Sequence, residues 1–202
     1  MNATAKPYHH GNLAESILQR AAEIIDEEGI EALTLRGIAR DLGVSHAAPN
    51  RHFRNKAALL SALAADAWQK ARNATLDEAE RTGSGNAHVR LNAMGRGYLR
   101  WALNNRALFR AAIHPDVSRY ATEDLRVATR QFTETVKEAI VQTQTEGRHP
   151  HVPLSILTIY TNAVPLGSAT LMIDSLLSTE HQSEEEQEAV IDQIINLVVP
   201  LS

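Results

Sequence analysis

Residues 35–56 read LRGIARDLGVSHAAPNRHFRNK, and this stretch decides how the first part of the chain folds. Two short amphipathic segments meet at Gly43, and Thr34 and Ser45 are residue types that begin helices. The small residue Ala39 stands where two crossing helices would touch, and the glycine suits the tight turn that follows. The stretch therefore predicts a helix-turn-helix unit whose short second helix begins at Ser45.

Helical patterns extend on both sides of this unit. Asn12 and Glu15 have the spacing of a capping box at the start of a first helix, and Gly29 is suited to end that helix. Asn55 can cap a further helix. The apolar positions recur at helical spacing and comprise Leu13, Ile17, Ala21, Ile24, Ile25, Leu35, Ile38, Ala39, Leu42, Leu59, Leu60, Leu63 and Ala67. We therefore expect four helices between residue 12 and about residue 78.

Several residues at fixed spacing carry a family resemblance: Ala21-Ala22, Gly29, Ile38-Ala39, Gly43-Val44-Ser45, His52-Phe53 and Lys56. On these residues, the run from Leu18 to Leu60 resembles the DNA-binding domain of tetracycline-repressor (TetR) type transcription regulators. The segments Gly97–Ala102 and Leu108–Arg110 are similar to the effector domain of one subgroup of that family. The resemblance implies an all-α fold, with a three-helix N-terminal DNA-binding domain and a helical effector and dimerisation domain.

The rest of the chain also reads as helices. Breaks at 82–86 and 147–153 separate expected helices, which are placed at 86–105, 106–113, 122–146 and 153–178. Ser183 and Glu186 form a second capping box that opens a last helix. The chain is thus expected to be all-α, with about nine helices. Its expected parts are a polar arm (1–11), the helix-turn-helix domain (12–58) and a ligand-binding and dimerisation domain (59–202).

Length and composition indicate a globular protein. The chain has 202 residues, of which 44% are hydrophobic and 22% charged, and it has no cysteine for disulfides or thiolate metal sites. Residues 1–11 are polar and lack the apolar run of a secretory signal, so a cytoplasmic location is expected. The apolar stretch 152–177 is interrupted by Pro165 and Asp174, which favours a buried helix over a membrane span.

The charge distribution gives limited support for nucleic-acid binding. The formal net charge is −4, and residues 1–66 hold seven Lys or Arg against eight acidic residues. The charges are nevertheless separated along the chain. Residues 26–31 are acidic, whereas residues 45–56 contain Arg51, Arg54 and Lys56 and no acidic residue. Because attraction to phosphate depends on where charge lies, a small basic surface is still predicted.

Position within the motif assigns the expected DNA contacts. Lys56 and Thr34 begin helices whose free amides suit phosphate groups, and His52 is expected to donate to phosphate. Base-edge contacts are expected from the surface of the short second helix. The candidate DNA-binding residues are Thr34, Ser45, His46, Ala47, Asn50, Arg51, His52 and Lys56. The arm residues Lys6, His9 and His10 are expected to reach along the backbone or into the minor groove.

Asn50 departs from the family pattern, which usually has an aromatic residue at this position. An amide can bond adenine or a phosphate but loses the apolar contact of a ring. Two readings follow: an altered base preference, or weakened or lost operator binding. The second reading describes a ligand-binding or protein-interaction module on the same scaffold.

Aromatic and polar residues between positions 68 and 174 either line a ligand cavity or belong to the core. The candidate ligand-binding residues are Trp68, Trp101, Phe109, His114, Tyr160, Asn162 and Met172, with Tyr98, Tyr120 and Asp174 as further candidates. The histidines lack metal-ligand spacing, and neither a nucleophile elbow nor a phosphate-binding glycine loop is present. We therefore expect no metal, no cofactor and no enzymatic activity.

The last two helices predict self-association. The helix at 153–178 is apolar on most sides, Gly167, Ser168 and Ala169 allow close approach, and Ile191–Val198 adds a second apolar stripe. Two copies would form a four-helix interface, although an internal core contact is the alternative. The resemblance implies a homodimeric repressor that binds double-stranded DNA at a near-palindromic site and is released by a small molecule, with no membrane partner.

Overall fold

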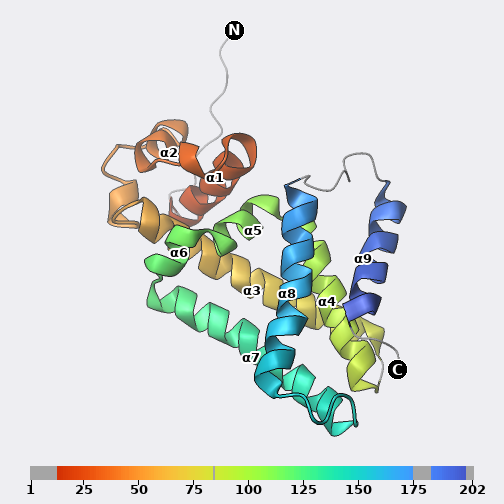
Figure 1. Cartoon of the computed structure of the whole chain (residues 1–202). Helices are drawn as coiled ribbons and strands as arrows, with labels where there is room; N and C mark the ends of the chain where they lie inside the picture. The colour runs from red at the N-terminus through yellow and green to blue at the C-terminus, as the bar shows by residue number, and fades with distance from the viewer. Residues whose placement is uncertain (1–12, 84, 175–182, 199–202) are drawn as a thin grey trace.

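The chain folds into helices joined by short loops in the part that the structure describes, residues 13–83, 85–174 and 183–198 of a computed structural model. Figure 1 shows the helices, whose bounds are α1 (Leu13–Glu28), η1 (Ile30–Ala32), α2 (Leu35–Asp41), η2 (Pro49–Arg51), α3 (Lys56–Thr82), α4 (Ala87–Asn104), α5 (Arg106–Ile113), α6 (Pro115–Arg119), α7 (Glu123–Thr145), α8 (Leu154–Ile173) and α9 (Glu184–Val198). These residues include nine α-helices and no strand, so the prediction of an all-α fold is confirmed.

The N-terminal unit consists of α1, α2, η2 and the start of α3. Its core is formed by fully buried side chains, among them Ile17, Ile25, Leu33, Ile38 and Leu59. The predicted caps at two helix starts are present: the Thr34 hydroxyl accepts from the Gly37 amide at 3.1 Å, and the Asn55 side chain accepts from the Ala58 amide at 2.8 Å. The expected cap Asn12 lies outside the described residues.

The turn inside the motif forms as the sequence predicts, but the second helix is different from the prediction. Gly43 adopts φ 66°, the left-handed conformation that favours glycine. The segment that follows is not an α-helix capped by Ser45. It is a series of tight turns that ends in the 3-10 helix η2, and the residue before η2 is Ala48, which makes no side-chain cap hydrogen bond.

Pro49 explains why this segment is wound more tightly. Proline has no amide hydrogen and cannot donate to the carbonyl oxygen of Ser45, four residues earlier, as an α-helix requires. That oxygen instead accepts from the Ala48 amide at 2.9 Å, and further three-residue turns join Arg51 to Ala48 and His52 to Pro49. Such turns are typical of 3-10 structure. The prediction of a regular recognition helix beginning at Ser45 was therefore wrong in its geometry.

α3 is the longest described helix and joins the two parts of the molecule. It runs for 27 residues and ends at Gly83, whose φ of 59° suits a helix C-terminus. Figure 1 shows it leaving the N-terminal unit and continuing between the helices of the second part. The expected boundary at residues 58 and 59 lies within this one helix.

The second part is a bundle in which α4, α5 and α7 pack on α3. α3 and α4 approach closely at Gly97, where a β-carbon would lie 2.5 Å from the carbonyl oxygen of Ala74. The short helix α6 was missed by the sequence reading, although His114 and Pro115 carry its start signal. The His114 Nδ1 atom accepts from the Asp116 amide at 3.2 Å, and Pro115 occupies the first turn.

α8 and α9 pack against each other and against α4. α8 ends at Ile173, and its expected continuation to residue 178 lies outside the described residues from 175 on. The predicted capping box of α9 is confirmed, because the Ser183 amide donates to Glu186 at 2.8 Å and the Glu186 amide donates back to Ser183 at 3.2 Å.

α8 has a more exposed apolar surface than a core helix. Its buried residues are Pro165, Ala169, Met172 and Ile173, whereas Ile159 is 66% exposed. By length and composition α8 is the one described helix that could cross a membrane, a test that core helices of soluble proteins also pass. The expected burial of this segment is thus incomplete within one chain.

Candidate DNA-binding surface and effector cavity

The segment between α2 and α3 presents one exposed face. Pro49 and Phe53 are buried and fix this segment to the core of the N-terminal unit. Between and before these anchors, the side chains on the surface are those of Ser45, His46, Ala47, Asn50, Arg51 and His52. The fold therefore leaves six of the predicted DNA-binding residues exposed along the segment between α2 and α3.

Two further predicted residues flank this stretch at helix starts. Thr34 is exposed and caps α2, so its hydroxyl is already engaged, and the free amides of the first turn remain available. Lys56 is the first residue of α3. Its Nζ atom lies 3.4 Å from the carbonyl oxygen of Glu31 and 3.8 Å from the Glu31 carboxylate. Because Glu31 is highly exposed, this ion pair is weak and can be exchanged for another anion.

The charges around this surface divide into paired and unpaired groups. Arg20 of α1 contacts Asp41 of α2 at 3.1 Å, and this hydrogen bond is the largest of the contributions that lower the pKa of Asp41. In contrast, Arg51 and Arg54 are exposed, and neither forms an ion pair within the described residues. The predicted basic surface is therefore present next to η2, where no acid of the local sequence neutralises it.

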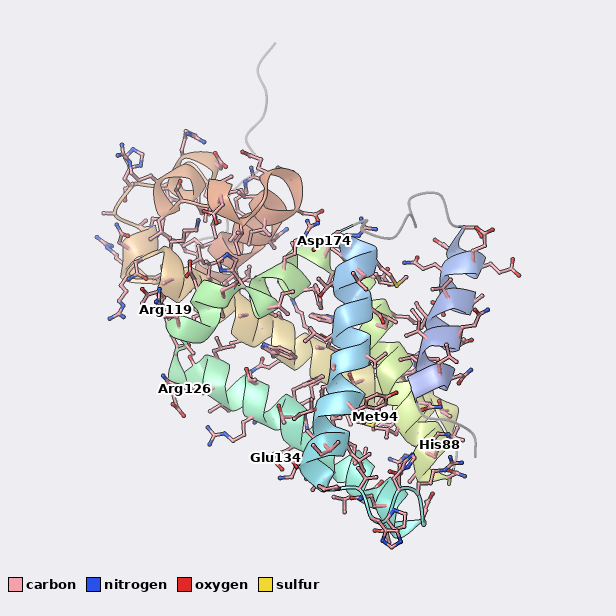
Figure 2. The ribbon with its side chains drawn as sticks, viewed as in Figure 1. His88, Met94, Arg119, Arg126, Glu134 and Asp174 are labelled. Carbon is pink, nitrogen blue, oxygen red and sulfur yellow. The ribbon has the colours of Figure 1, made fainter. Side chains whose placement is uncertain are left out.

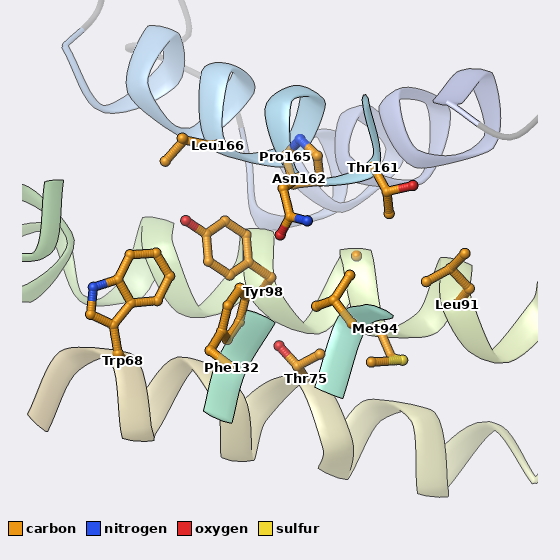
Figure 3. Close-up of a pocket in the computed structure, with 12 residues that line it drawn as sticks. Trp68, Thr75, Leu91, Met94, Tyr98, Phe132, Thr161, Asn162, Pro165 and Leu166 are labelled. Atoms are coloured by element: carbon orange, nitrogen blue, oxygen red, sulfur yellow. The ribbon is translucent and has the colours of Figure 1, made fainter. Parts of the chain in front are cut away.

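A cavity of about 80 Å³ lies in the second part of the molecule, the helical bundle. Figure 3 shows that side chains from four helices surround it: Trp68 and Thr75 of α3, Leu91, Met94, Gly95 and Tyr98 of α4, Phe132 and Val136 of α7, and Thr161, Asn162, Pro165 and Leu166 of α8. None of these residues carries a formal charge at neutral pH. The cavity therefore suits an uncharged, mainly apolar group.

A few polar atoms interrupt the apolar wall. The Asn162 Nδ2 atom donates to the Thr158 carbonyl at 2.7 Å, which leaves its oxygen pointing into the cavity (Figure 3). The Thr75 hydroxyl donates to the Ala71 carbonyl at 2.7 Å. Burial raises the pKa of Tyr98, so its hydroxyl stays protonated. The side-chain oxygen of Asn162 is thus an acceptor that could orient a ligand.

The structure brings together only some of the predicted ligand-binding residues. Trp68 and Asn162 line the cavity, as does the further candidate Tyr98. Tyr160 lines a second cavity nearer the N-terminal end of α8. The others lie elsewhere: Trp101 and Met172 are buried outside these linings, Phe109 is in the core at 1% exposure, and His114 caps α6.

Other lining residues were missed by sequence reasoning. Met94, Phe132 and Val136 lie at ordinary core positions of α4 and α7, and their spacing is that of any buried helix face. Only the packing of four helices determines which core residues border a cavity. Within residues 13–83, 85–174 and 183–198, no group of three or more His, Asp or Glu side chains could hold a metal ion.

The fold and the two sites define a helical regulator with an N-terminal helix-turn-helix. Sequence comparison agrees: "Bacterial regulatory proteins, tetR family" matches residues 17–63, and "Tetracyclin repressor-like, C-terminal domain" matches residues 91–196. The second match alone covers half of the chain. The chain belongs to the tetR family of bacterial regulatory proteins.

Curated relatives match over part of their length. The chain is 32% identical over 115 residues to the class D tetracycline repressor protein of Escherichia coli, which is 56% of this chain and 51% of that protein. It is equally similar to the class H protein of Photobacterium damsela subsp. piscicida, with the same identity and coverage. The chain thus spans about half the length of these curated relatives.

Solved structures match over nearly the whole chain. A protein of unknown function from Rhodococcus sp. RHA1 has a TM-score of 0.75 and 28% identity, and the match covers 97% of this chain and 100% of that one. The TetR family transcriptional regulator PfmR from Thermus thermophilus has a TM-score of 0.65 and 19% identity, covering 92% and 98% of the two chains. The latter likeness shows the fold.

Proposed function

We propose that the protein is a ligand-responsive transcriptional repressor that binds a near-palindromic DNA operator as a homodimer and is released by a small molecule. The observation that carries this proposal is the course of α3. The helix begins at Lys56 on the DNA-binding surface, and Trp68 and Thr75 of the same helix line the cavity. A molecule bound in the cavity therefore contacts the element that holds the DNA-reading segment. A cytoplasmic location and the absence of enzymatic activity are part of this proposal.

The contacts with DNA divide into two kinds. Thr34, His52 and Lys56 would position phosphates, because they lie at helix starts or at the edge of the exposed face. The base edges would be read by His46, Ala47, Asn50 and Arg51, with Ser45 at the beginning of the segment. The small side chain of Ala47 keeps this surface shallow enough to enter a major groove.

The homodimer would form through α8 and α9. Ile159, Ala163, Gly167 and Leu171 lie four residues apart on α8 and form a stripe that is largely exposed in the single chain. A β-carbon at Gly167 would meet no atom within 4 Å, so space for a neighbouring helix exists there. On α9, Leu197 is 78% exposed. Apolar stripes of this kind are typical of helix–helix interfaces.

Ligand binding would be coupled to DNA binding through the spacing of the two reading segments. In a two-fold dimer these segments face successive major grooves, about 34–36 Å apart. A ligand that fits the cavity better when α3 is shifted would favour the shifted arrangement. The reading segments would then move away from the DNA. α1 also packs on α5, which gives a second contact between the two parts.

A second candidate function is a ligand-binding or protein-interaction module that does not bind operators. The observations that favour it are the exposed Asn50, where the family usually has an aromatic residue, and the net charge of −4. The difference between the two candidates is binding to duplex DNA.

Fluorescence anisotropy with labelled duplexes from the DNA flanking the gene tests the proposal. We expect one fragment with an inverted repeat to bind, and the affinity to fall steeply as the salt concentration rises. Absence of binding to every fragment at low ionic strength would overturn the repressor and leave the second candidate.

A further inference from the structure

A second cavity lies beside the first one. Its volume is about 310 Å³, and it is lined by Leu91 of α4, Ile140 and Thr143 of α7, Arg148, His149 and Val152 of the α7–α8 connection, and Ile156, Leu157, Tyr160 and Thr161 of α8. Leu91 and Thr161 line both cavities. The two cavities are therefore neighbours that share these two side chains as their common wall.

The cavities follow each other along α8. The lining residues of the first are at 161–166 of this helix, and those of the second are at 156–161. At a rise of 1.5 Å per residue, the span from residue 156 to residue 166 is about 15 Å. Figure 3 shows Leu91 and Thr161 at one end of the first cavity and Trp68 at the other. An extended molecule that passes between Leu91 and Thr161 would therefore lie along α8 in both spaces.

The two ends of this path differ in charge. The first cavity has no charged side chain, whereas Arg148 and His149 border the second, and neither cavity is lined by a carboxylate. The nearby Glu146 carboxylate is engaged with the Ala87 amide, with oxygens at 3.0 and 2.9 Å from it. Burial is the largest cause that lowers the pKa of His88, and the positive charge of Arg148 is the second.

We propose that the effector is an organic acid with an extended apolar body. Its anionic group would lie at Arg148 and His149, and its apolar part would pass Leu91 and Thr161 toward Trp68. A cation at one end of an otherwise mainly apolar path favours this arrangement, because a charged hydrogen-bond donor binds an anion more strongly than a neutral one does. The inference rests on the proposed function, of which it specifies the ligand class.

A surface groove that Trp68 also lines is a competing site for an anion. Its other lining residues include Arg126, Arg130 and Glu134 of α7. Both arginines lie 3.6 Å from the Glu123 carboxylate, and Glu134 adds a second acid to this groove. Figure 2 shows Arg126 far from the end of the molecule that holds His88. The acids make this groove the poorer site for an anion.

Calorimetric titration of the full chain with sodium decanoate, 1-decanol and decylamine tests the ligand class. The three probes share one apolar chain and differ in the charge of the end group. We expect decanoate to bind about tenfold more tightly than the alcohol, since a hydrogen bond to a charged group contributes more than a neutral one. Equal affinities for acid and alcohol, tighter binding of the amine, or no binding of decanoate would overturn the proposal.

Variants locate the anionic group. We expect Arg148→Gln to weaken decanoate binding about tenfold and to leave decanol binding unchanged, and Arg148→Lys to restore most of the affinity. The matched control is Arg130→Gln in the competing groove. Loss of affinity in the control but not in Arg148→Gln would contradict the assignment. Unchanged decanol binding shows that a variant is folded.

A larger side chain at the common wall tests the path itself. Thr161→Leu should narrow the passage, so that decanoate loses affinity while hexanoate, which fits within the second cavity, keeps it. Equal effects on both acids would contradict an extended path. Operator binding by the same variants, measured by anisotropy, separates the two proposals: retained DNA binding with failed decanoate binding rejects only the ligand class.

Discussion

Lys56 is the residue at which the proposed DNA-binding surface meets the helix that lines the cavity. We expect Lys56→Ala to weaken binding to all duplex sequences alike and to reduce the salt slope by about one unit, since one phosphate contact is lost. Anisotropy titrations at several salt concentrations measure this slope. Lys70→Ala is the matched control, because Lys70 lies on the same helix and pairs with Asp66 at 2.8 Å. A salt slope that stays unchanged in Lys56→Ala would show that Lys56 does not contact a phosphate.

His88 predicts a pH dependence of stability. The side chain is 2% exposed, and neither ring nitrogen has a hydrogen-bond partner within the described residues. Burial, the field of Arg148 and that of His149 lower its pKa from the ordinary value of 6.5, against the opposite effect of Glu146. Below about pH 6.5 the unfolded chain then binds the proton more readily than the folded one, so the free energy of unfolding decreases as the pH is lowered.

We expect His88→Leu to reduce this loss of stability between pH 7 and pH 5, as measured by urea unfolding. His46→Gln replaces an exposed histidine and should leave the pH dependence as it is in the wild type. Identical pH dependence of His88→Leu and the wild type would show that His88 does not titrate as the structure implies.

Single residues also show what sequence reasoning could reach. The caps Thr34, Asn55 and Ser183 were predictable because a cap depends on its own helix start. The 3-10 geometry after Ser45 was not predicted although its cause, Pro49, is visible in the sequence, since a proline in the first turn of an α-helix removes at most one of its hydrogen bonds.

At the scale of elements, α3 and α4 pack with almost no space at Gly97. A β-carbon there would lie 2.5 Å from the Ala74 carbonyl oxygen and 2.9 Å from the Glu78 β-carbon. We expect Gly97→Ala to lower the free energy of unfolding by about 2 kcal/mol, because the two helices must separate. Urea unfolding measures the change.

Gly95→Ala is the comparison for this prediction. The new β-carbon would lie 2.9 Å from the Cδ1 atom of Ile195, the flexible end of a side chain, so a smaller cost is expected. If Gly97→Ala were as stable as Gly95→Ala, the close approach of α3 and α4 would not be a feature of the folded protein.

The exposed stripe of α8 makes a prediction about assembly. Gly167→Leu should fill open space without disturbing the single chain, and leucine also favours a helix more than glycine does. We expect light scattering to show a monomer, with helix content by circular dichroism unchanged. Gly85→Leu, at another glycine with open space, should remain dimeric. A dimeric Gly167→Leu variant would place the interface elsewhere.

Elements differ in how far the sequence determines them. The ranges of α4, α5 and α7 were predicted to within a residue or two, since apolar periodicity and break residues are local signals. The walls of the cavity were not, because Met94 and Phe132 have the pattern of any core position. Which helices leave a space between them depends on the tertiary packing of the bundle.

For the whole molecule, the arrangement of the two proposed sites along α3 was only partly predictable. The helix-turn-helix and its family were recognisable from spacing in residues 18–60. The continuity of one 27-residue helix from the DNA-binding surface to the cavity became visible in the structure. The expected domain boundary at residue 58 lies within α3. The helix packs against different elements on the two sides of this position, but its apolar residues keep the same helical spacing.

Two copies of this chain are proposed to present two DNA-reading segments to one operator. Sedimentation velocity of a labelled duplex that carries the flanking inverted repeat tests it most directly. We expect a complex of two chains per duplex at low ionic strength, which is lost when the half-sites are moved by half a helical turn. A complex with one chain per duplex, or a duplex that sediments alone, would contradict it.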